Sequence, residues 1–188
     1  MTAIHALVLA CWIAFVAYWL LQAVGVKRAR ESQSTASLLA DRSLTFSGGV
    51  LLFWPHPPGW LGFVPFPGSW ATGAAGLAAC VCGLAVAVWA RHTLGANWSS
   101  RVTVKVGHEL VEHGPYRFVR HPIYTGILLI SLGTALEGDR AACVVGLGLL
   151  FAGFWIKLRK EERLMLQAFP ATYPRYRARV KALVPGLL

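Results

Sequence analysis

The sequence predicts an all-α integral membrane protein with five transmembrane helices. Of its 188 residues, 56% are hydrophobic and only 14% are charged, and the mean hydropathy is +0.54. These values are too apolar for an ordinary soluble domain, and the length allows one compact helical bundle. A net charge of +10 in a soluble protein would suggest nucleic acid. In a membrane protein basic loops mark the cytoplasmic side instead, so we expect no nucleic-acid partner.

The first expected span covers residues 2–26, which contain no Lys, Arg, Asp or Glu. A run of this length is enough to cross a hydrocarbon core of about 30 Å. A cleaved signal peptide is the alternative, but no basic segment precedes the run and no small-residue cleavage site closes it. The basic flank at 27–30 instead favours a span that stops there.

A second uncharged run, from residue 43 to residue 90, is too long for one helix and predicts two spans. Half of the chain's prolines interrupt it at 55–67, together with tryptophan, which is typical of an interfacial turn. The expected spans are therefore about 44–60 and 69–91. Three glycines of the later span would allow another helix to approach closely, or simply reflect how common glycine is in membrane helices: Gly73, Gly76 and Gly83.

Two apolar runs, 122–136 and about 141–157, predict a helical hairpin because only four residues join them. A polar loop at 92–121 precedes the hairpin. After residue 157 the pattern becomes basic and amphipathic, so the segment 157–188 is expected to be a cytoplasmic tail and not a sixth span.

The basic residues predict the orientation. Seventeen of the 18 fall in the loop after the first span, in the middle loop or in the tail, and only Arg140 lies elsewhere. With five spans these three blocks share one side, which places the N-terminus outside and the C-terminus in the cytoplasm, in a plasma or inner membrane. The middle loop and the tail can therefore meet.

The cysteines predict neither a disulfide framework nor a metal site. All four lie in apolar runs without a C-x-x-C pattern or a histidine at ligand spacing, and they are expected to be small core residues: Cys11, Cys80, Cys82 and Cys143.

The longest polar interruption of the chain is GHELVEHGPYRFVRHPIYTG, Gly107 to Gly126. It holds three histidines, two arginines, two glutamates and two tyrosines. Its two X-Pro steps disfavour one continuous helix, so we expect an ordered loop. Such a polar cluster at the mouth of a membrane span is where chemistry is expected.

The tail carries the acidic pair Glu161-Glu162 among basic residues. Spacing alone favours surface pairing with its helix neighbours Lys157, Lys160 and Arg163. In the loop, the basic residues can equally contact lipid headgroups, and the tyrosines can belong to an interfacial aromatic belt.

Taken together, the two segments resemble the isoprenylcysteine carboxyl methyltransferase family, and more broadly the membrane methyltransferases that include phospholipid N-methyltransferases. The first motif, H-x-L-V-x-x-G-x-Y-x-x-x-R-H-P-x-Y-x-G, runs from His108 to Gly126. After the apolar hairpin, the second consists of Glu161-Glu162 followed by Phe169, Tyr173 and Tyr176. The resemblance covers roughly residues 94–180.

The resemblance implies a five-span enzyme that binds S-adenosyl-L-methionine in a cytoplasmic pocket closed by the C-terminal helical tail. The implied partners are membrane lipids and a lipophilic small-molecule or lipidated substrate, with no metal. Carboxyl O-methylation of an isoprenylcysteine-like substrate is the implied reaction. Three alternatives stay open: a phospholipid or small-amine N-methyltransferase, a sterol-reductase-like enzyme that uses NADPH, and a non-catalytic membrane binding protein.

The matching positions imply the site residues. The implied cofactor contacts are Arg101, His108, Glu109, Leu110, Val111, Tyr116, His121, Pro122, Ile123, Tyr124 and Glu161. The candidates for catalysis are Lys157, Arg120 and Glu162, and Arg91 is a further candidate cation.

Lys157 departs from the eukaryotic relatives, which place an arginine four residues before the first glutamate. Lysine keeps the positive charge but loses the bidentate fork of arginine. A carboxylate acceptor is already ionised near neutral pH and needs a cation to position it. An amine acceptor must first lose a proton, for which Glu162 or a histidine is a candidate base.

Overall fold

The structure is a computed structural model that describes residues 3–23, 35–65, 68–95 and 110–188. The described residues form helices and loops with one isolated β-bridge, which confirms the all-α class. The helices are α1 (Ala3–Ala23), α2 (Thr35–Phe53), α3 (Trp70–Leu94), α4 (Pro122–Gly138), α5 (Ala141–Ala168) and α6 (Tyr173–Arg179), with 3₁₀ turns η1 (Gly59–Gly62) and η3 (Gly114–Arg117).

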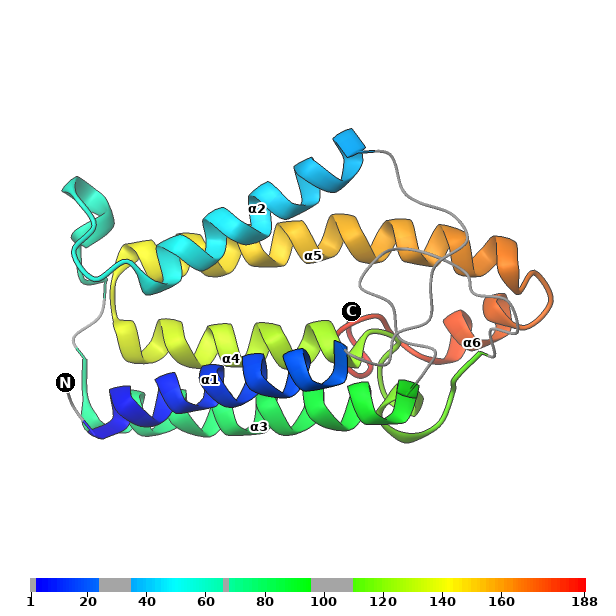
Figure 1. The fold of residues 1–188 in the computed structure, drawn as a ribbon, viewed down its shortest axis with the longest axis horizontal. Coiled ribbons are helices and arrows are strands. Elements are labelled where there is room, and N and C mark those ends of the chain that lie inside the picture. The colour runs from blue at the N-terminus through cyan, green and yellow to red at the C-terminus, as the bar shows by residue number, and fades with distance from the viewer. Residues whose placement is uncertain (1–2, 24–34, 66–67, 96–109) are drawn as a thin grey trace.

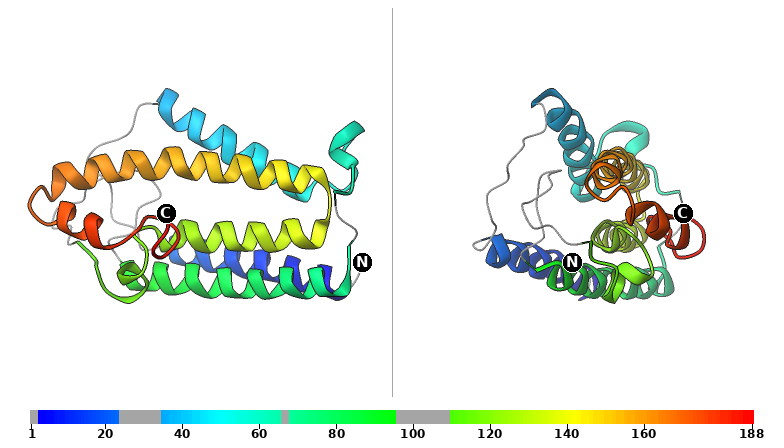
Figure 2. Two further views of the ribbon diagram at one scale, coloured as in Figure 1. Left: turned by 180° about the vertical axis from the view of Figure 1, so that it is seen from behind. Right: turned by 90° about the vertical axis from the view of Figure 1, so that its right-hand side faces the viewer.

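The five long helices run roughly along one axis in two layers (Figure 1). Helix α2 packs on α5 in one layer, and α4 packs on α3, with α1 beside them, in the other. The hairpin of α4 and α5 joins the two layers. Seen from behind and from the end in Figure 2, α6 and the C-terminal segment lie across one end of this arrangement.

Glycines set the close approach of α3 and α4. A Cβ built at Gly83 would lie 2.5 Å from the backbone oxygen of Gly126 and 2.7 Å from the nitrogen of Ile130. Gly76 faces the backbone of Gly133 in the same way, one heptad earlier. The glycines of the third helix therefore serve helix packing, which confirms the first of the two interpretations.

Local signals explain where the helices begin and end. Ser69 and Thr72 form a capping box at the start of α3, with Ser69 Oγ accepting from Thr72 N at 3.1 Å. Proline occupies the first position of α4, where its missing N–H costs nothing. The α4–α5 turn contains Asp139 with a left-handed φ of 46°.

The bounds of α2 differ from the expected span at 44–60. The helix begins at Thr35 and ends at Phe53. The charges at 41 and 42 were expected to lie before the helix, but the helix continues through them, because a charged side chain costs little helix propensity. The helix ends before Pro55, because a proline disfavours the α conformation of the residue that precedes it.

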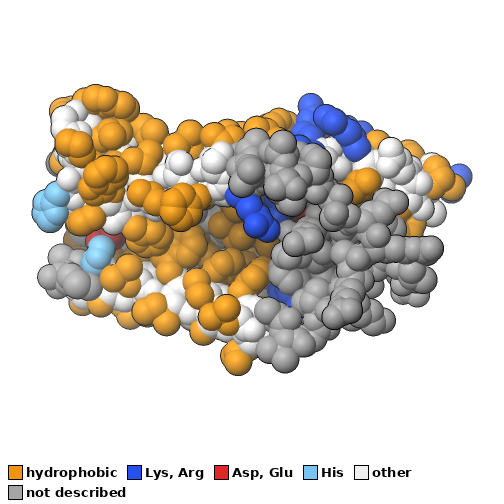
Figure 3. Space-filling view, turned by 45° about the horizontal axis from the view of Figure 1, so that its top comes forward, with side chains coloured by type: hydrophobic (Ala, Val, Ile, Leu, Met, Phe, Trp, Pro, Cys, Tyr) orange, Lys and Arg blue, Asp and Glu red, His pale blue; other side chains and the backbone are white. Residues whose placement is uncertain are grey.

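Three described helices are long and apolar enough to cross a membrane, namely α1 over Ala3–Gln22, α3 and α5, and α4 is a shorter apolar helix. On the face shown in Figure 3, hydrophobic side chains cover the left-hand and middle parts of the bundle, whereas the Lys and Arg side chains lie in its middle and right-hand parts. The protein is therefore a multi-pass membrane protein. The count of five spans and the side of each terminus stay predictions.

Helix α5 is longer than a span requires. Its 28 residues extend about 42 Å, against about 30 Å for a hydrocarbon core. The apolar part ends at Ile156, and the charged part continues the same helix to Ala168. The charged side chains of the second motif are thus carried on a rigid continuation of a membrane helix.

Candidate active site

The loop before α4 is ordered by a short turn and by the C-terminal segment. Gly114, with a φ of +60°, opens the turn η3. Val119 then forms a parallel bridge with Lys181. Within the described residues 110–126, the loop gives way to helix at Pro122, as the two X-Pro steps predicted.

The tail holds the loop through its backbone. The N–H groups of Arg120 and His121 donate to Lys181 O at 2.8 Å and to Ala182 O at 3.0 Å. One turn into α4, Thr125 Oγ1 donates to Leu183 O at 2.8 Å. The middle loop and the tail therefore meet, as their shared basic character predicted.

Arg120 and Glu162 form a buried ion pair between the loop and α5. Arg120 donates to Glu162 Oε1 from Nε at 2.8 Å and from Nη2 at 2.5 Å. The two side chains are only 8% and 5% exposed. Arg177 Nε of α6 lies 3.5 Å from the other carboxylate oxygen. Glu162 is thus a buried carboxylate held by cations from two distant segments, and the surface-pairing interpretation is wrong for it.

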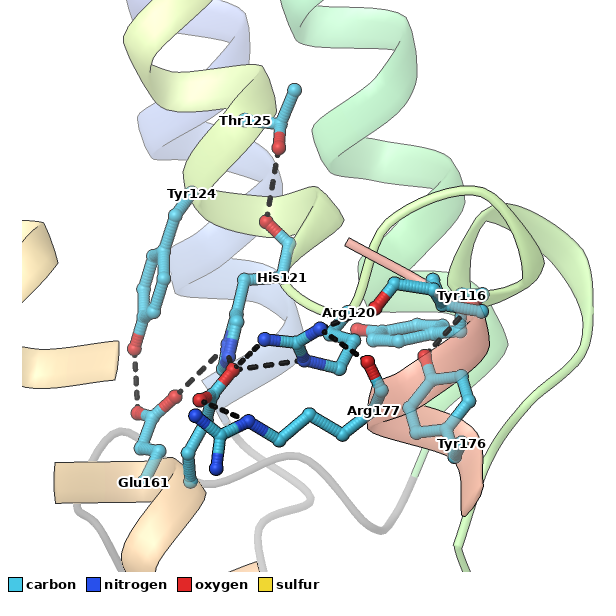
Figure 4. Close-up of polar contacts among 10 residues, drawn as sticks. Tyr116, Arg120, His121, Tyr124, Thr125, Glu161, Tyr176 and Arg177 are labelled. Carbon is cyan, nitrogen blue, oxygen red and sulfur yellow. Dashed lines mark hydrogen bonds and ion pairs between the residues drawn. The ribbon is translucent and has the colours of Figure 1, made fainter. Parts of the chain in front are cut away.

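His121 lies beside Glu161 (Figure 4) and within ion-pair distance of both glutamates. Its Nδ1 is 3.5 Å from Glu161 Oε2 and its Nε2 is 3.4 Å from Glu162 Oε1. Burial alone would lower the pKa of His121, but the hydrogen bonds and negative charges of the two glutamates outweigh it, so the pKa is raised above 6.5. The acidic pair therefore favours the imidazolium form of His121, whose two ring nitrogens each face one carboxylate.

Tyr124 connects α4 to Glu161. Its hydroxyl donates to Glu161 Oε1 at 2.5 Å. Its ring stacks on His121 at 5.6 Å and on Phe154 at 4.9 Å between centroids. Lys157 Nζ lies 5.4 Å from the centre of the same ring, which places a cation beside Glu161 and one turn before it on α5.

A tyrosine contact ties α6 to the loop. Tyr176 donates to the backbone oxygen of Tyr116 at 2.6 Å, and the Tyr116 hydroxyl in turn lies 3.4 Å from Ala90 O of α3. Burial raises the pKa of Tyr116, Tyr173 and Tyr176, so all three phenols are neutral at physiological pH.

The structure brings together six of the sequence-predicted residues in one cluster, drawn from the loop, the start of α4 and α5: Arg120, His121, Tyr124, Lys157, Glu161 and Glu162. Pro122 is buried and begins α4, and Ile123 packs against the hydrophobic cluster around Tyr124 and Leu158. Tyr116 lies one step away, at the tyrosine contact.

Three other predicted residues that the structure describes have different surroundings: Leu110, Val111 and Arg91. Leu110 and Val111 are half-buried in the loop, and Arg101, His108 and Glu109 lie outside the described residues. Arg91 bonds Gln22 O and Gly95 O at the end of α3.

Sequence reasoning missed Arg177 and Phe154. Arg177 belongs to a basic run that reads as a solvated surface, and Phe154 to a membrane helix, so only the fold shows that they reach the cluster.

Comparison with known proteins shows which family shares these segments. Residues 75–167 match the model of the isoprenylcysteine carboxyl methyltransferase family. This range contains the loop, the hairpin and both glutamates. This part of the chain is therefore similar to the isoprenylcysteine carboxyl methyltransferase family.

Two relatives of known sequence match the chain over different lengths. The chain is 27% identical over 164 residues to protein-S-isoprenylcysteine O-methyltransferase from Dictyostelium discoideum, covering 84% of this chain and 68% of that protein. It is 40% identical over 63 residues to the uncharacterised protein YpbQ from Bacillus subtilis, covering 34% of this chain and 36% of YpbQ.

A solved structure shares the fold of this chain. The structure of a eukaryotic intramembrane Ras methyltransferase of the isoprenylcysteine carboxyl methyltransferase type matches with a TM-score of 0.52 at 24% identity. The match covers 81% of this chain and 52% of that one. This chain thus spans only about half of the solved eukaryotic chain.

Proposed function

We propose that this chain is an S-adenosylmethionine-dependent methyltransferase that O-methylates the carboxylate of a lipophilic, isoprenylcysteine-like acceptor at the membrane. The family match over residues 75–167 supports methyl transfer. The observation that carries the proposal is the meeting of Tyr124, His121 and Glu161 where the apolar helices end. A soluble methyl donor and a lipid-tailed acceptor can both reach such a position.

The cluster fits the donor's functional groups. The Glu161 side chain is 23% exposed, and its carboxylate has lone pairs beyond the bond from Tyr124, so it can accept from an ammonium or a ribose hydroxyl. The rings of His121, Tyr124 and Phe154 form an aromatic wall beside it. We propose that these residues, with Tyr116 and the segments 108–111 and 121–124, hold the donor.

Methyl transfer to a carboxylate requires the protein mainly to align the two substrates. S-adenosylmethionine would supply an electrophilic methyl group for in-line displacement. The chain's part is to orient an acceptor that is already nucleophilic and to exclude water from it. We assign the orienting role to Lys157, whose ammonium lies beside Tyr124 and Glu161. A carboxylate acceptor needs no base.

The state of Glu162 favours O-methylation over N-methylation. An ammonium acceptor would require a base to remove its proton. Glu162 accepts two hydrogen bonds from Arg120 and lies within ion-pair distance of His121 and Arg177. A carboxylate surrounded by cations is a poor proton acceptor. His121 in its protonated form is also a poor proton acceptor, so neither group is suited to act as the base.

Calorimetric titration of the detergent-purified protein with S-adenosylhomocysteine tests the cofactor. Binding by the wild type should weaken about ten- to a hundredfold in Glu161→Gln, since a bond to a charged group is lost. Glu112→Gln, which changes a glutamate of the loop paired with Arg179, should bind as the wild type does. No binding by folded wild-type protein would overturn the proposal and turn attention to NADPH.

Methyl transfer from labelled donor tests the acceptor. A prenylated cysteine with a free carboxylate should be methylated in vesicles, while its amide and phosphatidylethanolamine should not. Methylation of the amine lipid alone would favour the N-methyltransferase alternative, and donor binding without transfer to any acceptor would favour a binding protein.

We also propose that the end carrying the cluster faces the cytoplasm and that the N-terminus lies outside. Arg140, the one basic residue expected on the other side, bonds Pro55 O at the opposite end of the bundle. In a cysteine-free chain, Ser69→Cys should react with an impermeant maleimide added from outside. Arg175→Cys should react with it only after permeabilisation. The reverse pattern would contradict this orientation.

A further inference from the structure

Every nitrogen of the Arg120 guanidinium donates within the protein. Nε and Nη2 bond the Glu162 carboxylate. Nη1 bonds the backbone oxygen of Val180 and, at 3.3 Å, that of Arg177. With its side chain only 8% exposed, Arg120 is directed to internal partners and not to an acceptor molecule.

The two carbonyls belong to the C-terminal end of α6. Arg177 lies in the last turn of the helix and Val180 is its C-cap residue. Carbonyls at this end of a helix lack intrahelical partners, and a cation there is favoured by the helix dipole. Arg120 therefore satisfies the end of α6 and the buried carboxylate of α5 at once.

We propose that Arg120 is a positioning residue that fastens α6 to α5 and thereby orients the candidate donor site. The contacts run without a break from the α6 carbonyls through Arg120 and Glu162 to His121, Glu161 and Tyr124. Loss of the guanidinium fork would free α6 and let His121 and Glu161 turn away. The consequence for catalysis rests on the proposed methyltransferase function, whereas the fastening of α6 does not.

A second ion pair provides a natural control. Arg179 of α6 bonds Glu112 of the loop at 2.7 Å, but the two side chains are 68% and 36% exposed. Exposed pairs contribute little, whereas a buried pair leaves an uncompensated charge when one partner is removed. Breaking this outer pair should therefore leave α6 in place.

Limited trypsin digestion of the full chain in detergent measures the fastening directly. Trypsin cuts after Arg175, Arg177 and Arg179 of α6 once the helix opens. Arg120→Lys, which keeps the charge but loses the fork, and Glu162→Gln should each raise the cleavage rate about ten- to a hundredfold, the effect of losing a hydrogen bond to a charged group. The double variant should be cleaved no faster than the faster single one, and Glu112→Gln should stay within about twofold of the wild type.

Steady-state kinetics separate positioning from substrate contact. Arg120→Lys should lower kcat about tenfold or more with the acceptor KM changed by less than about twofold. A raised acceptor KM with unchanged trypsin cleavage would overturn the proposal and make Arg120 an acceptor-binding residue. Digestion needs no substrate. If the variants are cleaved faster but the wild type transfers no methyl group, the proposal that Arg120 fastens α6 still holds, and only the methyltransferase assignment is refuted. Unchanged cleavage in both Arg120→Lys and Glu162→Gln would refute the fastening itself.

Discussion

The Tyr124 hydroxyl donates a 2.5 Å hydrogen bond to Glu161 and so joins the first turn of α4 to the charged part of α5. The two residues are 37 positions apart in the chain. Their contact is where the two polar motifs of the sequence meet, at the end of the apolar helices. The donor site that we propose depends on this contact and on its neighbours.

Removal of the Tyr124 hydroxyl should weaken donor binding. In Tyr124→Phe the ring still packs on Phe154 and His121, but Glu161 loses its hydrogen bond and its fixed orientation. The Kd for S-adenosylhomocysteine should rise about tenfold by calorimetry. Tyr18→Phe, which removes a hydroxyl from α1, is the matched control and should bind normally. Equal affinities for Tyr124→Phe and the wild type would contradict the assignment of Glu161.

Lys157 should act on the acceptor and not on the donor. Lys157→Gln removes the charge and should raise the acceptor KM about tenfold or more, with a donor KM close to that of the wild type. Lys157→Arg should retain most of the activity, because the guanidinium keeps the charge and adds a bidentate fork for a carboxylate. Steady-state kinetics with each substrate varied in turn makes the distinction. A larger effect on the donor than on the acceptor would assign Lys157 to the donor site instead.

The raised pKa of His121 predicts a stability that depends on pH. The folded protein binds this proton more tightly than the unfolded chain, whose histidine has the ordinary pKa of 6.5. The stabilisation is therefore fully present below pH 6.5 and is lost as the pH rises through the higher pKa of the folded state. The difference in thermal unfolding midpoint between the wild type and His121→Gln should shrink as the pH is raised.

The exposed His56 provides the control for this measurement. His56→Gln removes an exposed histidine and should change the unfolding midpoint only slightly. A difference between the wild type and His121→Gln that grows with rising pH would show that His121 is neutral in the folded protein.

The close packing of α3 and α4 predicts that Gly83 does not tolerate a methyl group. In Gly83→Ala the added Cβ would meet the backbone of Gly126 and of Ile130, so the helices must separate. Overpacking of this kind costs about 1–3 kcal/mol, which should appear as a lower unfolding midpoint in detergent. Gly148→Ala places its Cβ in open space on α5 and should be neutral or slightly stabilising. Equal midpoints for both variants would contradict the packing.

Much of the fold was predictable because hydropathy is a local property. Long apolar runs predicted α1, α3 and α5, and the four-residue turn predicted the α4–α5 hairpin. The start of α2 was not predictable, because charges that end an apolar run need not end the helix that carries it.

The sequence by itself determined which residue types gather at one end of the bundle: two polar motifs, each at the end of an apolar run, in a chain long enough for one membrane domain. Only the tertiary structure decided their partners. Glu162 had basic helix neighbours within one turn, yet it pairs with Arg120, 42 positions away. Helix spacing predicts only the contacts between residues on one face of the same helix. A charge buried at the junction of the loop, α5 and α6 needs a compensating partner, and the fold decides which residue that partner is.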